Sequence, residues 1–342
     1  MKLSVLIPMH NASDYIERCL TSIYQQGIQE RDFEVIIIDD GSTDNSVELV
    51  ARFQESHSNV NLFREKNIGA YATRNKLLEL AKGTFIYCMD ADDYLAYDNL
   101  SKLLNTAFEE ELELICFDTK VTSSEDDFRS EIPISPGYRP KISTGMDFIR
   151  EHPNHRVEIW WYLIQREFLE RKELVFDNNQ YNADVIFTLK LLIKSNRVGY
   201  APFSIHRYYQ SPNSLMRHSD PYKKKRLLIS FYSMVKDLNT YVDSVSNTSN
   251  GISEDIVEIL KKRRDHFSFY FLVKLTGAGL SIDCLKRKVK SLKQLKVYPL
   301  GTYIGNTNSL KYQFLNLMIN NEQVLFPLAR LNRFIKQFPG WS

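Results

Sequence analysis

Residues 33–46, FEVIIIDDGSTDNS, contain the pattern that decides the fold. A short run rich in β-branched residues ends on two carboxylates, as expected of a buried strand that stops at a polar edge. Gly41 permits a tight turn, and Ser42, Thr43 or Asp44 can cap a helix that continues with apolar residues at helical spacing. The stretch therefore predicts a strand, a turn and a helix, which form one unit of an α/β fold.

The same alternation recurs through the first 120 residues. Apolar, strand-like runs alternate with amphipathic helical patterns, and either Asn11 or Ser13 could cap the helix after the first run. Such an order gives right-handed βαβ units and a mostly parallel sheet with helices on both faces. Ligands of these sheets bind beyond the carboxyl ends of the strands. The predicted strands lie at residues 3–8, 33–39, 60–64, 84–90 and 112–118.

The rest of the chain divides into a second α/β half and a helical extension. The pattern predicts a loop or lid, then a strand leading into a short helix, a longer helix and another strand, at 121–145, 158–170, 183–195 and 198–210. From about Pro221 the pattern becomes helical and basic. We therefore expect one α/β domain over residues 1–220, with halves at 1–118 and 119–220, and a helical basic extension over 221–342.

The composition favours a globular protein of a reducing compartment. The 342 residues are 43% hydrophobic and 25% charged, and no window approaches the roughly 20 apolar residues of a membrane span. The first residues, MKLSVLIPMHN, do not resemble a signal peptide. The four cysteines are widely spaced and form no CxxC pair, which argues against a zinc site or disulfide framework. We expect a soluble, cytoplasmic protein.

The carboxyl-terminal tail is strongly basic. Residues 281–342 hold ten Lys or Arg against two acids, Asp283 and Glu322, whereas the whole chain has a net charge of only +2. The tail could be a solvated helix face, or it could attract anionic headgroups on the inner face of the cytoplasmic membrane. Phe334, Phe338 and Trp341 lie among the charges, as in interfacial helices. An apolar helical tail could also pack against a second copy, so a homodimer stays open.

Residues 87–95, YCMDADDYL, place three carboxylates directly after an apolar run. Burying unpaired carboxylates is costly, so the cluster needs a cation, a partner or water. Two carboxylates one residue apart, Asp90 and Asp92, can share Mg²⁺ or Mn²⁺, which keeps further sites for phosphate oxygens. By itself the pattern is also common in turns and helix caps.

Two further stretches carry polar groups at the same predicted edge. A carboxylate of the Asp39–Asp40 pair can accept a hydrogen bond from a base or ribose, and helix capping does not explain both. In NIGAYATRN, residues 67–75, Gly69 allows close backbone approach and Arg74 can reach a phosphate. An ordinary helix start is the alternative for this stretch.

Taken in order, these motifs resemble the nucleotide-binding half of a family-two glycosyltransferase with the GT-A fold, over roughly residues 3–118. The resemblance implies a Rossmann-like donor half, a nucleotide-diphosphate sugar donor, most often UDP-linked, Mn²⁺ or Mg²⁺, and inverting transfer to an acceptor hydroxyl. It implies that Asp39 reads the base or ribose, that Asp90 lies near the ribose and donor sugar, and that Asp92 is the main metal ligand. The donor-contacting positions carried over are Pro8, His10, Asn11, Asp39, Asn67, Gly69, Arg74, Asp90 and Ala91.

Two departures from the family pattern stand out. His10 occupies a position where the family commonly has Tyr, and Ala183 replaces the Glu of the usual acidic pair. Asp184 remains and corresponds to the general base that takes the acceptor proton; a helix-start acid is the alternative. The weaker candidates on the acceptor side are Trp160, His206, Tyr209, Ser214 and Arg217.

These observations predict a hexosyl- or N-acetylhexosaminyltransferase that extends a bacterial surface glycan, such as a capsule or O-antigen, on a saccharide or lipid-linked saccharide acceptor. A catalytically inactive donor-binding or partner subunit is the alternative, because Ala183 breaks the acidic pair. A sugar nucleotidyltransferase is disfavoured, since no glycine-rich, basic phosphate loop follows the first strand. The chain lacks the GxGxxG of dinucleotide-dependent dehydrogenases and any recognisable nucleic-acid-binding module.

Overall fold

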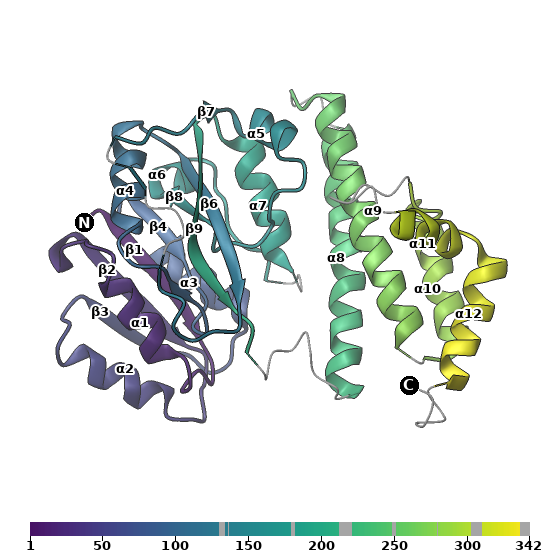
Figure 1. The fold of residues 1–342 in the computed structure, drawn as a ribbon, viewed down its shortest axis with the longest axis horizontal. Coiled ribbons are helices and arrows are strands. Elements are labelled where there is room, and N and C mark those ends of the chain that lie inside the picture. The colour runs from purple at the N-terminus through teal and green to yellow at the C-terminus, as the bar shows by residue number, and fades with distance from the viewer. Residues whose placement is uncertain are drawn as a thin grey trace. The chain divides into compact units, whose positions relative to one another are not determined.

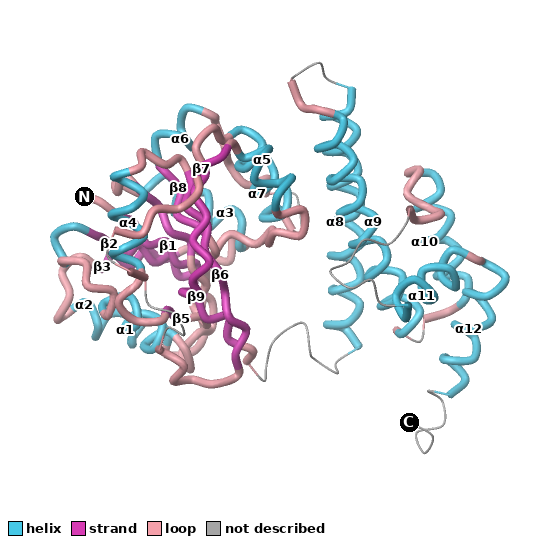
Figure 2. The backbone as a smooth tube through the Cα atoms, turned by 45° about the horizontal axis from the view of Figure 1, so that its top comes forward, coloured by secondary structure: helices cyan, strands magenta, loops and turns pink. Residues whose placement is uncertain are grey.

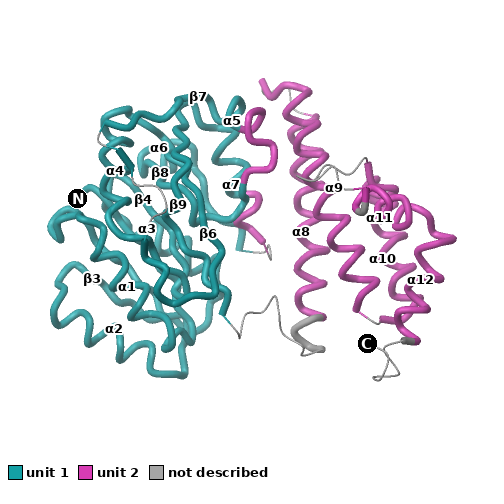
Figure 3. Tube along the Cα trace, in the orientation of Figure 1, with its two compact units in different colours: residues 1–148, 156–179, 187–212 teal, residues 149–155, 180–186, 213–342 magenta. Residues whose placement is uncertain are grey.

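The computed structural model describes residues 1–129, 134–135, 137–178, 182–211, 221–247, 251–278, 280–301 and 310–335. The chain forms two compact units (Figure 3). Unit 1 comprises Met1–Phe148, Arg156–Asn179 and Phe187–Pro212, and unit 2 comprises Ile149–His155, Gln180–Ile186 and Asn213–Ser342. Two short stretches before residue 213 thus belong to the carboxyl-terminal unit. The expected boundary at residue 220 stays a prediction.

Unit 1 is built on one nine-stranded sheet with helices around it (Figures 1 and 2). Its strands follow the order β3-β2-β1-β4-β8-β6-β9-β5, with β7 paired to β9. The strands are β1 (Leu3–Met9), β2 (Phe33–Asp39), β3 (Val60–Arg64), β4 (Phe85–Cys88), β5 (Tyr94–Leu95), β6 (Leu114–Thr122), β7 (Ile142–Ser143), β8 (Tyr162–Gln165) and β9 (Val198–Tyr209). This arrangement confirms the predicted α/β class.

The first four strands of the order, β3, β2, β1 and β4, are parallel. Nearly every residue of β1 and β2 is buried, because helices cover both faces of this part of the sheet. The helices that connect these strands are α1 (Ile16–Tyr24), α2 (Ser46–Gln54) and α3 (Ala70–Leu80). In the second half β4 pairs antiparallel with β8, and β8 pairs antiparallel with β6, while β6 and β9 are parallel.

The cap expected for the first helix was wrong. Tyr15 precedes α1 and makes no side-chain capping bond, so neither Asn11 nor Ser13 caps it. The cap expected for the second helix was also wrong, because Asn45 precedes α2 and makes no side-chain capping bond, although Asp44 Oδ1 accepts a hydrogen bond from the Ser46 backbone N–H at 3.1 Å. The side chain of Asn11 is used elsewhere, in the loop that follows β2.

Short helices complete the second half: α4 (Leu100–Glu109), α5 (Gly145–Glu151), α6 (Arg166–Arg171) and α7 (Ala183–Lys194). The buried side chains of β1, β2, β4 and β6 form one core with those of α1 and α4. The sheet core therefore supports the strand ends at which the motif residues lie.

The helices of unit 2 are α8 (Pro221–Asn247), α9 (Glu254–Gly277), α10 (Ile282–Gln294), α11 (Leu310–Asn320) and α12 (Glu322–Ile335). They share a second apolar core, which includes Val235 of α8, Phe271 of α9, Val289 of α10 and Leu325 of α12. Within the described part of the chain no helix is long and apolar enough to cross a membrane. The expected helical extension is thus a packed bundle.

Candidate active site

The loop after β2 fixes the backbone of the NIGAYATRN stretch. The Asp40 carboxylate is almost fully buried and accepts hydrogen bonds from the backbone N–H groups of Ile68 at 2.6 Å and Gly69 at 2.9 Å. Asn67 and Gly69 both have positive φ, at 52° and 93°. Nothing lies within 4 Å of a Cβ built on Gly69, so its φ, and not crowding, requires glycine there. Asp40 thus shapes this loop.

Asp39 is fully buried at the carboxyl end of β2. Its Oδ1 accepts a hydrogen bond from the Ser42 N–H at 3.1 Å, and its Oδ2 lies 3.7 Å from Arg64 Nε. Among the described residues Oδ2 accepts no hydrogen bond. Within the described part of the chain, one oxygen of the carboxylate expected to read the base or ribose thus accepts no hydrogen bond and lies beside the Arg64 guanidinium.

The loops after β1 and β2 are tied together through Asn11. Its backbone N–H donates to Ser42 Oγ at 2.8 Å, and its side-chain oxygen accepts from the Thr43 N–H at 2.8 Å. The neighbouring His10 ring places Nδ1 2.9 Å from the Asp40 carbonyl oxygen. Pro8 lies in β1, paired with Ile38 of β2. The candidate donor residues of the first two strands therefore form one connected edge.

Three carboxylates gather after β4. Asp90, Asp92 and Asp93 each offer an oxygen within 4.8 Å of the others, and Ala91 between them is buried. Burial, followed by the charges of Asp93 and Asp90, raises the pKa of Asp92 to about 7. A bound cation would offset that repulsion, and three carboxylate oxygens are the hard donors that Mg²⁺ and Mn²⁺ take. The residues present fit such an ion.

Arg74 of α3 connects the NIGAYATRN stretch to this cluster. One guanidinium nitrogen lies 2.5 Å from Asp90 Oδ1, and both side chains are largely shielded from solvent. A guanidinium beside a carboxylate that faces a metal can also bind a phosphate oxygen. The structure thus brings together two motifs 16 residues apart, as the edge rule for parallel sheets predicts.

Asp93 ties the acidic cluster to β9. It is fully buried, its Oδ1 accepts a hydrogen bond from the Tyr209 N–H at 2.8 Å, and its Oδ2 lies 3.1 Å from His206 Nε2. Burial lowers the pKa of His206 to about 3 and raises the pKa of Asp93 well above its usual range. Burial therefore favours the uncharged form of both groups.

Three of the weaker acceptor-side candidates, Trp160, His206 and Tyr209, pack beside Asp93 of the acidic cluster or beside each other. The Trp160 ring stacks on the His206 ring with centroids 4.4 Å apart, and its carbonyl oxygen accepts a hydrogen bond from the Tyr87 hydroxyl at 3.1 Å. Trp160, His206 and Tyr209 are all buried. Their burial favours support of Asp93 over contact with a substrate.

Arg18 of α1 is a site residue that sequence reasoning missed. Its guanidinium donates to the Asp92 carbonyl oxygen at 2.8 Å and lies over the rings of Tyr209 and Tyr94, at 4.1 and 4.6 Å from their centroids. These contacts hold the backbone of the acidic loop between α1 and β9. No local spacing signals this role, because the partners come from two segments that are both distant from Arg18 in the sequence.

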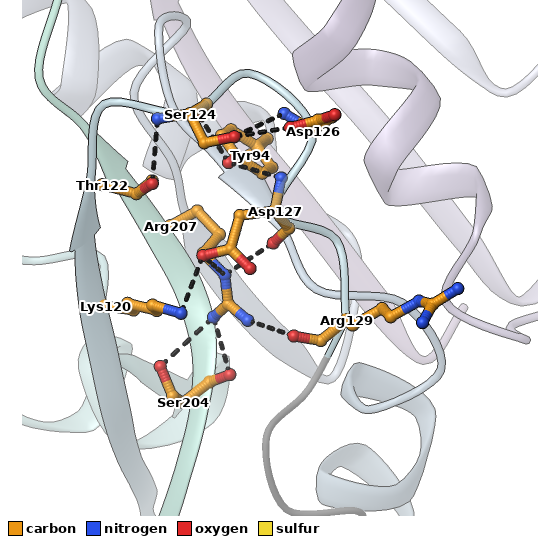
Figure 4. A network of polar contacts seen from close by, with 9 residues as sticks. All are labelled: Tyr94, Lys120, Thr122, Ser124, Asp126, Asp127, Arg129, Ser204 and Arg207. Atoms are coloured by element: carbon orange, nitrogen blue, oxygen red, sulfur yellow. Dashed lines mark hydrogen bonds and ion pairs between the residues drawn. The ribbon is translucent and has the colours of Figure 1, made fainter.

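A buried arginine fixes the loop that follows β6 (Figure 4). Arg207 is fully buried, and it donates to the backbone carbonyl oxygens of Asp127 at 2.8 Å, Ser204 at 2.8 Å and Arg129 at 2.7 Å. The Tyr94 hydroxyl donates to the Ser124 carbonyl oxygen at 2.8 Å. The segment expected to be a loop or a lid is therefore anchored where it is described, next to β5, the strand that follows the acidic cluster.

The structure does not place three of the predicted site residues relative to this group. Asp184 is half-buried in the first turn of α7, in the segment that belongs to unit 2. Ser214 and Arg217 lie outside the described residues, as do Phe338 and Trp341 of the tail. The roles of these residues stay predictions.

Known proteins that resemble this chain in sequence or in fold include glycosyltransferases. Residues 4–172 match the family described as glycosyl transferase family 2. An uncharacterized glycosyltransferase, YibD, of Escherichia coli is 29% identical over 220 residues, which is 63% of each chain. The fold resembles TarS 1-349 of S. aureus, solved in complex with UDP, at a TM-score of 0.63, 16% identity, and coverage of 98% of this chain and 91% of that one.

A second solved structure extends the likeness. The mannosyltransferase PcManGT of Pyrobaculum calidifontis, in complex with GDP-Man and Mn²⁺, matches at a TM-score of 0.54 and 16% identity, over 98% of this chain and 88% of that one. These two likenesses concern the fold, whereas the match over residues 4–172 covers every motif from β1 to β8. Residues 4–172 of this chain form a glycosyl transferase family 2 domain.

Proposed function

We propose that the protein is an inverting glycosyltransferase that moves a sugar from a nucleotide-diphosphate donor to an acceptor hydroxyl. The main support for the proposal is the ion pair between a guanidinium nitrogen of Arg74 and Asp90 Oδ1, 2.5 Å apart. Asp90 belongs to a cluster of three carboxylates at the edge formed by β1, β2 and β4. A cation-binding cluster beside an arginine suits a diphosphate, which carries several negative charges.

The donor would occupy the edge formed by the loops after β1 and β2. Asp39 Oδ2, buried and without a hydrogen bond among the described residues, would accept one from the base or ribose. We propose a uridine nucleotide, since this carboxylate suits the uracil N–H and since TarS, which shares the fold, was solved with UDP. The GDP-Man in PcManGT makes a guanosine nucleotide the second candidate.

The acidic cluster would hold one divalent ion, with Asp90 and Asp92 as ligands. Bound Mn²⁺ or Mg²⁺ would offset the negative charge of the diphosphate. Arg18 would keep the Asp92 backbone in place through its bond to the carbonyl oxygen, and Arg74 would hold Asp90 and a phosphate oxygen. These residues position the donor before transfer.

We propose Asp184 as the general base. The acceptor oxygen would attack the anomeric carbon as the bond from that carbon to the diphosphate oxygen breaks, and the acceptor proton would pass to Asp184. In-line attack and departure invert the configuration of the carbon. Asp184 is half-buried in the first turn of α7, and a carboxylate oxygen can take a proton from a hydroxyl, as a general base does. The acceptor we propose is a hydroxyl of a bacterial surface glycan, free or lipid-linked.

The test begins with calorimetric titration of UDP and of GDP, each with and without Mn²⁺. Wild type is compared with Asp92→Ala and with Asp14→Ala, an exposed acid that serves as the control. We expect Mn²⁺-dependent UDP binding in wild type and in the control, and its loss in Asp92→Ala. Binding of GDP in place of UDP would revise the base, and equal binding by Asp92→Ala would overturn the metal assignment.

The alternative, an inactive donor-binding subunit, rests on Ala183 in place of the usual acid. Release of UDP from UDP-sugars distinguishes the two, because slow hydrolysis of the donor needs no acceptor. Donor binding without any release of UDP, across UDP-hexoses and UDP-N-acetylhexosamines, would favour the inactive subunit.

A further inference from the structure

Helices α11 and α12 carry large apolar side chains that face solvent. On α11 they recur every three or four residues, and on α12 every three, so each set forms one stripe along its helix. The exposed side chains are Leu310 at 81%, Phe314 at 62% and Leu317 at 70% on α11, and Leu328 at 40%, Leu331 at 55% and Phe334 at 59% on α12. We call these six residues the apolar face.

The apolar face is not needed for the core of unit 2. The opposite side of α11 is packed, with Ile319 only 5% exposed, and that of α12 buries Leu325 and Ala329. Asn332 also points inward and donates a hydrogen bond to the Thr276 carbonyl oxygen of α9 at 3.0 Å. Both helices therefore bury one side in the bundle and present a second apolar side outward.

The charged residues of α12 that follow Leu328 are both basic. Arg330 and Arg333 are exposed between and beside its leucines on α12. Over residues 281–301 and 310–335 the chain has nine Lys or Arg and only two acids, Asp283 and Glu322. Glu322 is already paired with Lys293. The surface therefore combines exposed apolar side chains with an excess of positive charge.

We propose that the apolar face of α11 and α12 docks on an anionic lipid membrane. Helices that lie in a membrane interface combine a stripe of Leu and Phe with Lys or Arg at its border, as these two do. Anionic headgroups would pair with Arg330 and Arg333 while the leucines enter the boundary of the acyl chains. This inference concerns unit 2 alone and stands whether or not the proposed donor site is correct.

A second copy of the chain is a less suitable occupant. In a two-fold symmetric dimer the same face meets itself, so Arg330 and Arg333 would approach the same basic residues of the partner. Like charges brought together at an interface oppose association, whereas anionic lipid neutralises them. Charge complementarity thus favours the membrane.

The first test reports on the environment of single positions. Leu317→Cys and Leu331→Cys are made in a Cys284→Ser background, since Cys19, Cys88 and Cys116 are buried, and labelled with an environment-sensitive fluorophore. Ile229→Cys, at a 41% exposed leucine-sized site on α8, is the matched control. With vesicles of phosphatidylcholine and phosphatidylglycerol we expect a blue shift at 317 and 331 and none at 229.

The second test isolates the charge. Arg330→Glu/Arg333→Glu is compared with Lys225→Glu/Lys236→Glu, which makes the same change in net charge at exposed positions of α8. At about fivefold per basic residue near an anionic surface, losing two should weaken vesicle binding at least about 25-fold. The α8 variant should bind much more tightly than the α12 variant.

Three outcomes would overturn the proposal. Fluorophores at 317 and 331 that do not respond to anionic vesicles would exclude docking by this face. Equal loss of binding in the two charge variants would mean that net charge alone acts. A blue shift without vesicles, together with a dimer by light scattering that Leu317→Asn dissociates, would assign the face to a second copy.

Discussion

Asp40 offers the sharpest test of how the donor edge is built. Its carboxylate accepts hydrogen bonds from the N–H groups of Ile68 and Gly69, at 2.6 and 2.9 Å. Hydrogen bonds to a charged group contribute about 1.5–3 kcal/mol each, so the two together give roughly 3–6 kcal/mol. Residues 67–70 are exposed, and water can reach the freed N–H groups. We therefore expect Asp40→Ala to lower the free energy of unfolding by about 2–3 kcal/mol.

The assay is urea unfolding followed by circular dichroism, with UDP titration on the same preparations. Asp40→Asn keeps one acceptor and should lose about 1.5 kcal/mol, the value of one bond. Asp14→Ala, an exposed acid, should stay within about 0.5 kcal/mol of wild type. Because the loop would no longer hold Asn67 and Gly69 at positive φ, UDP affinity should fall about tenfold. Wild-type stability together with wild-type affinity in Asp40→Ala would refute this reasoning.

Three further predictions concern separate groups. Asp184→Asn should abolish sugar transfer while leaving the dissociation constant for UDP within about twofold, the limit of calorimetric comparison; full activity would remove Asp184 as the base. Arg207→Met leaves three carbonyl acceptors and Asp127 without their buried cation, so the free energy of unfolding in urea should fall by about 3 kcal/mol. Lys120→Met, at the more exposed end of the same network, should lower it by less than about 1 kcal/mol. Equal effects of the two substitutions would contradict the buried role of Arg207. Burial, with the charge of Arg263 adding to it, lowers the pKa of His155 well below its usual range, so the unfolded chain binds a proton first as pH falls. Stability is then complete above about pH 6.5 and falls by up to about 1.4 kcal/mol per pH unit below it, and His155→Asn should flatten that slope in unfolding measured from pH 7 to 5.

The donor half of the fold was readable from the sequence because its signals are local. Each strand is an apolar run, each turn has its glycine or carboxylate, and parallel βαβ units bring successive strand ends to one edge. The meeting of Arg74 with Asp90 follows from that rule, as does the acidic cluster. The periodicity of the carboxyl-terminal part likewise predicted helices.

The remainder depends on contacts between distant segments, which no short pattern records. The insertion of β8 between β4 and β6 is antiparallel and follows no βαβ rule. Arg18 and Arg207 look like ordinary surface cations in the sequence, yet one lies over two tyrosine rings and the other is fully buried. The sequence also could not show that Asp40 binds the backbone of the next loop while Asp39 keeps one oxygen without a hydrogen bond among the described residues. Two adjacent carboxylates cannot be told apart until the backbone around them is known.

The position of β4 has a consequence for recombination between relatives. This strand pairs in parallel with β1 through Phe85–Cys88 and antiparallel with β8 through Phe85–Tyr87, so it belongs to both halves of the sheet at once. If two relatives are joined before β4, this strand must pair with a β1 that comes from the other relative. If they are joined after the acidic loop, β4 must pair with a β8 that comes from the other relative. Grafts that exchange the donor half should therefore carry β1 through Asp93 as one block, and the strand that replaces β8 must pair with the backbone of Phe85–Tyr87.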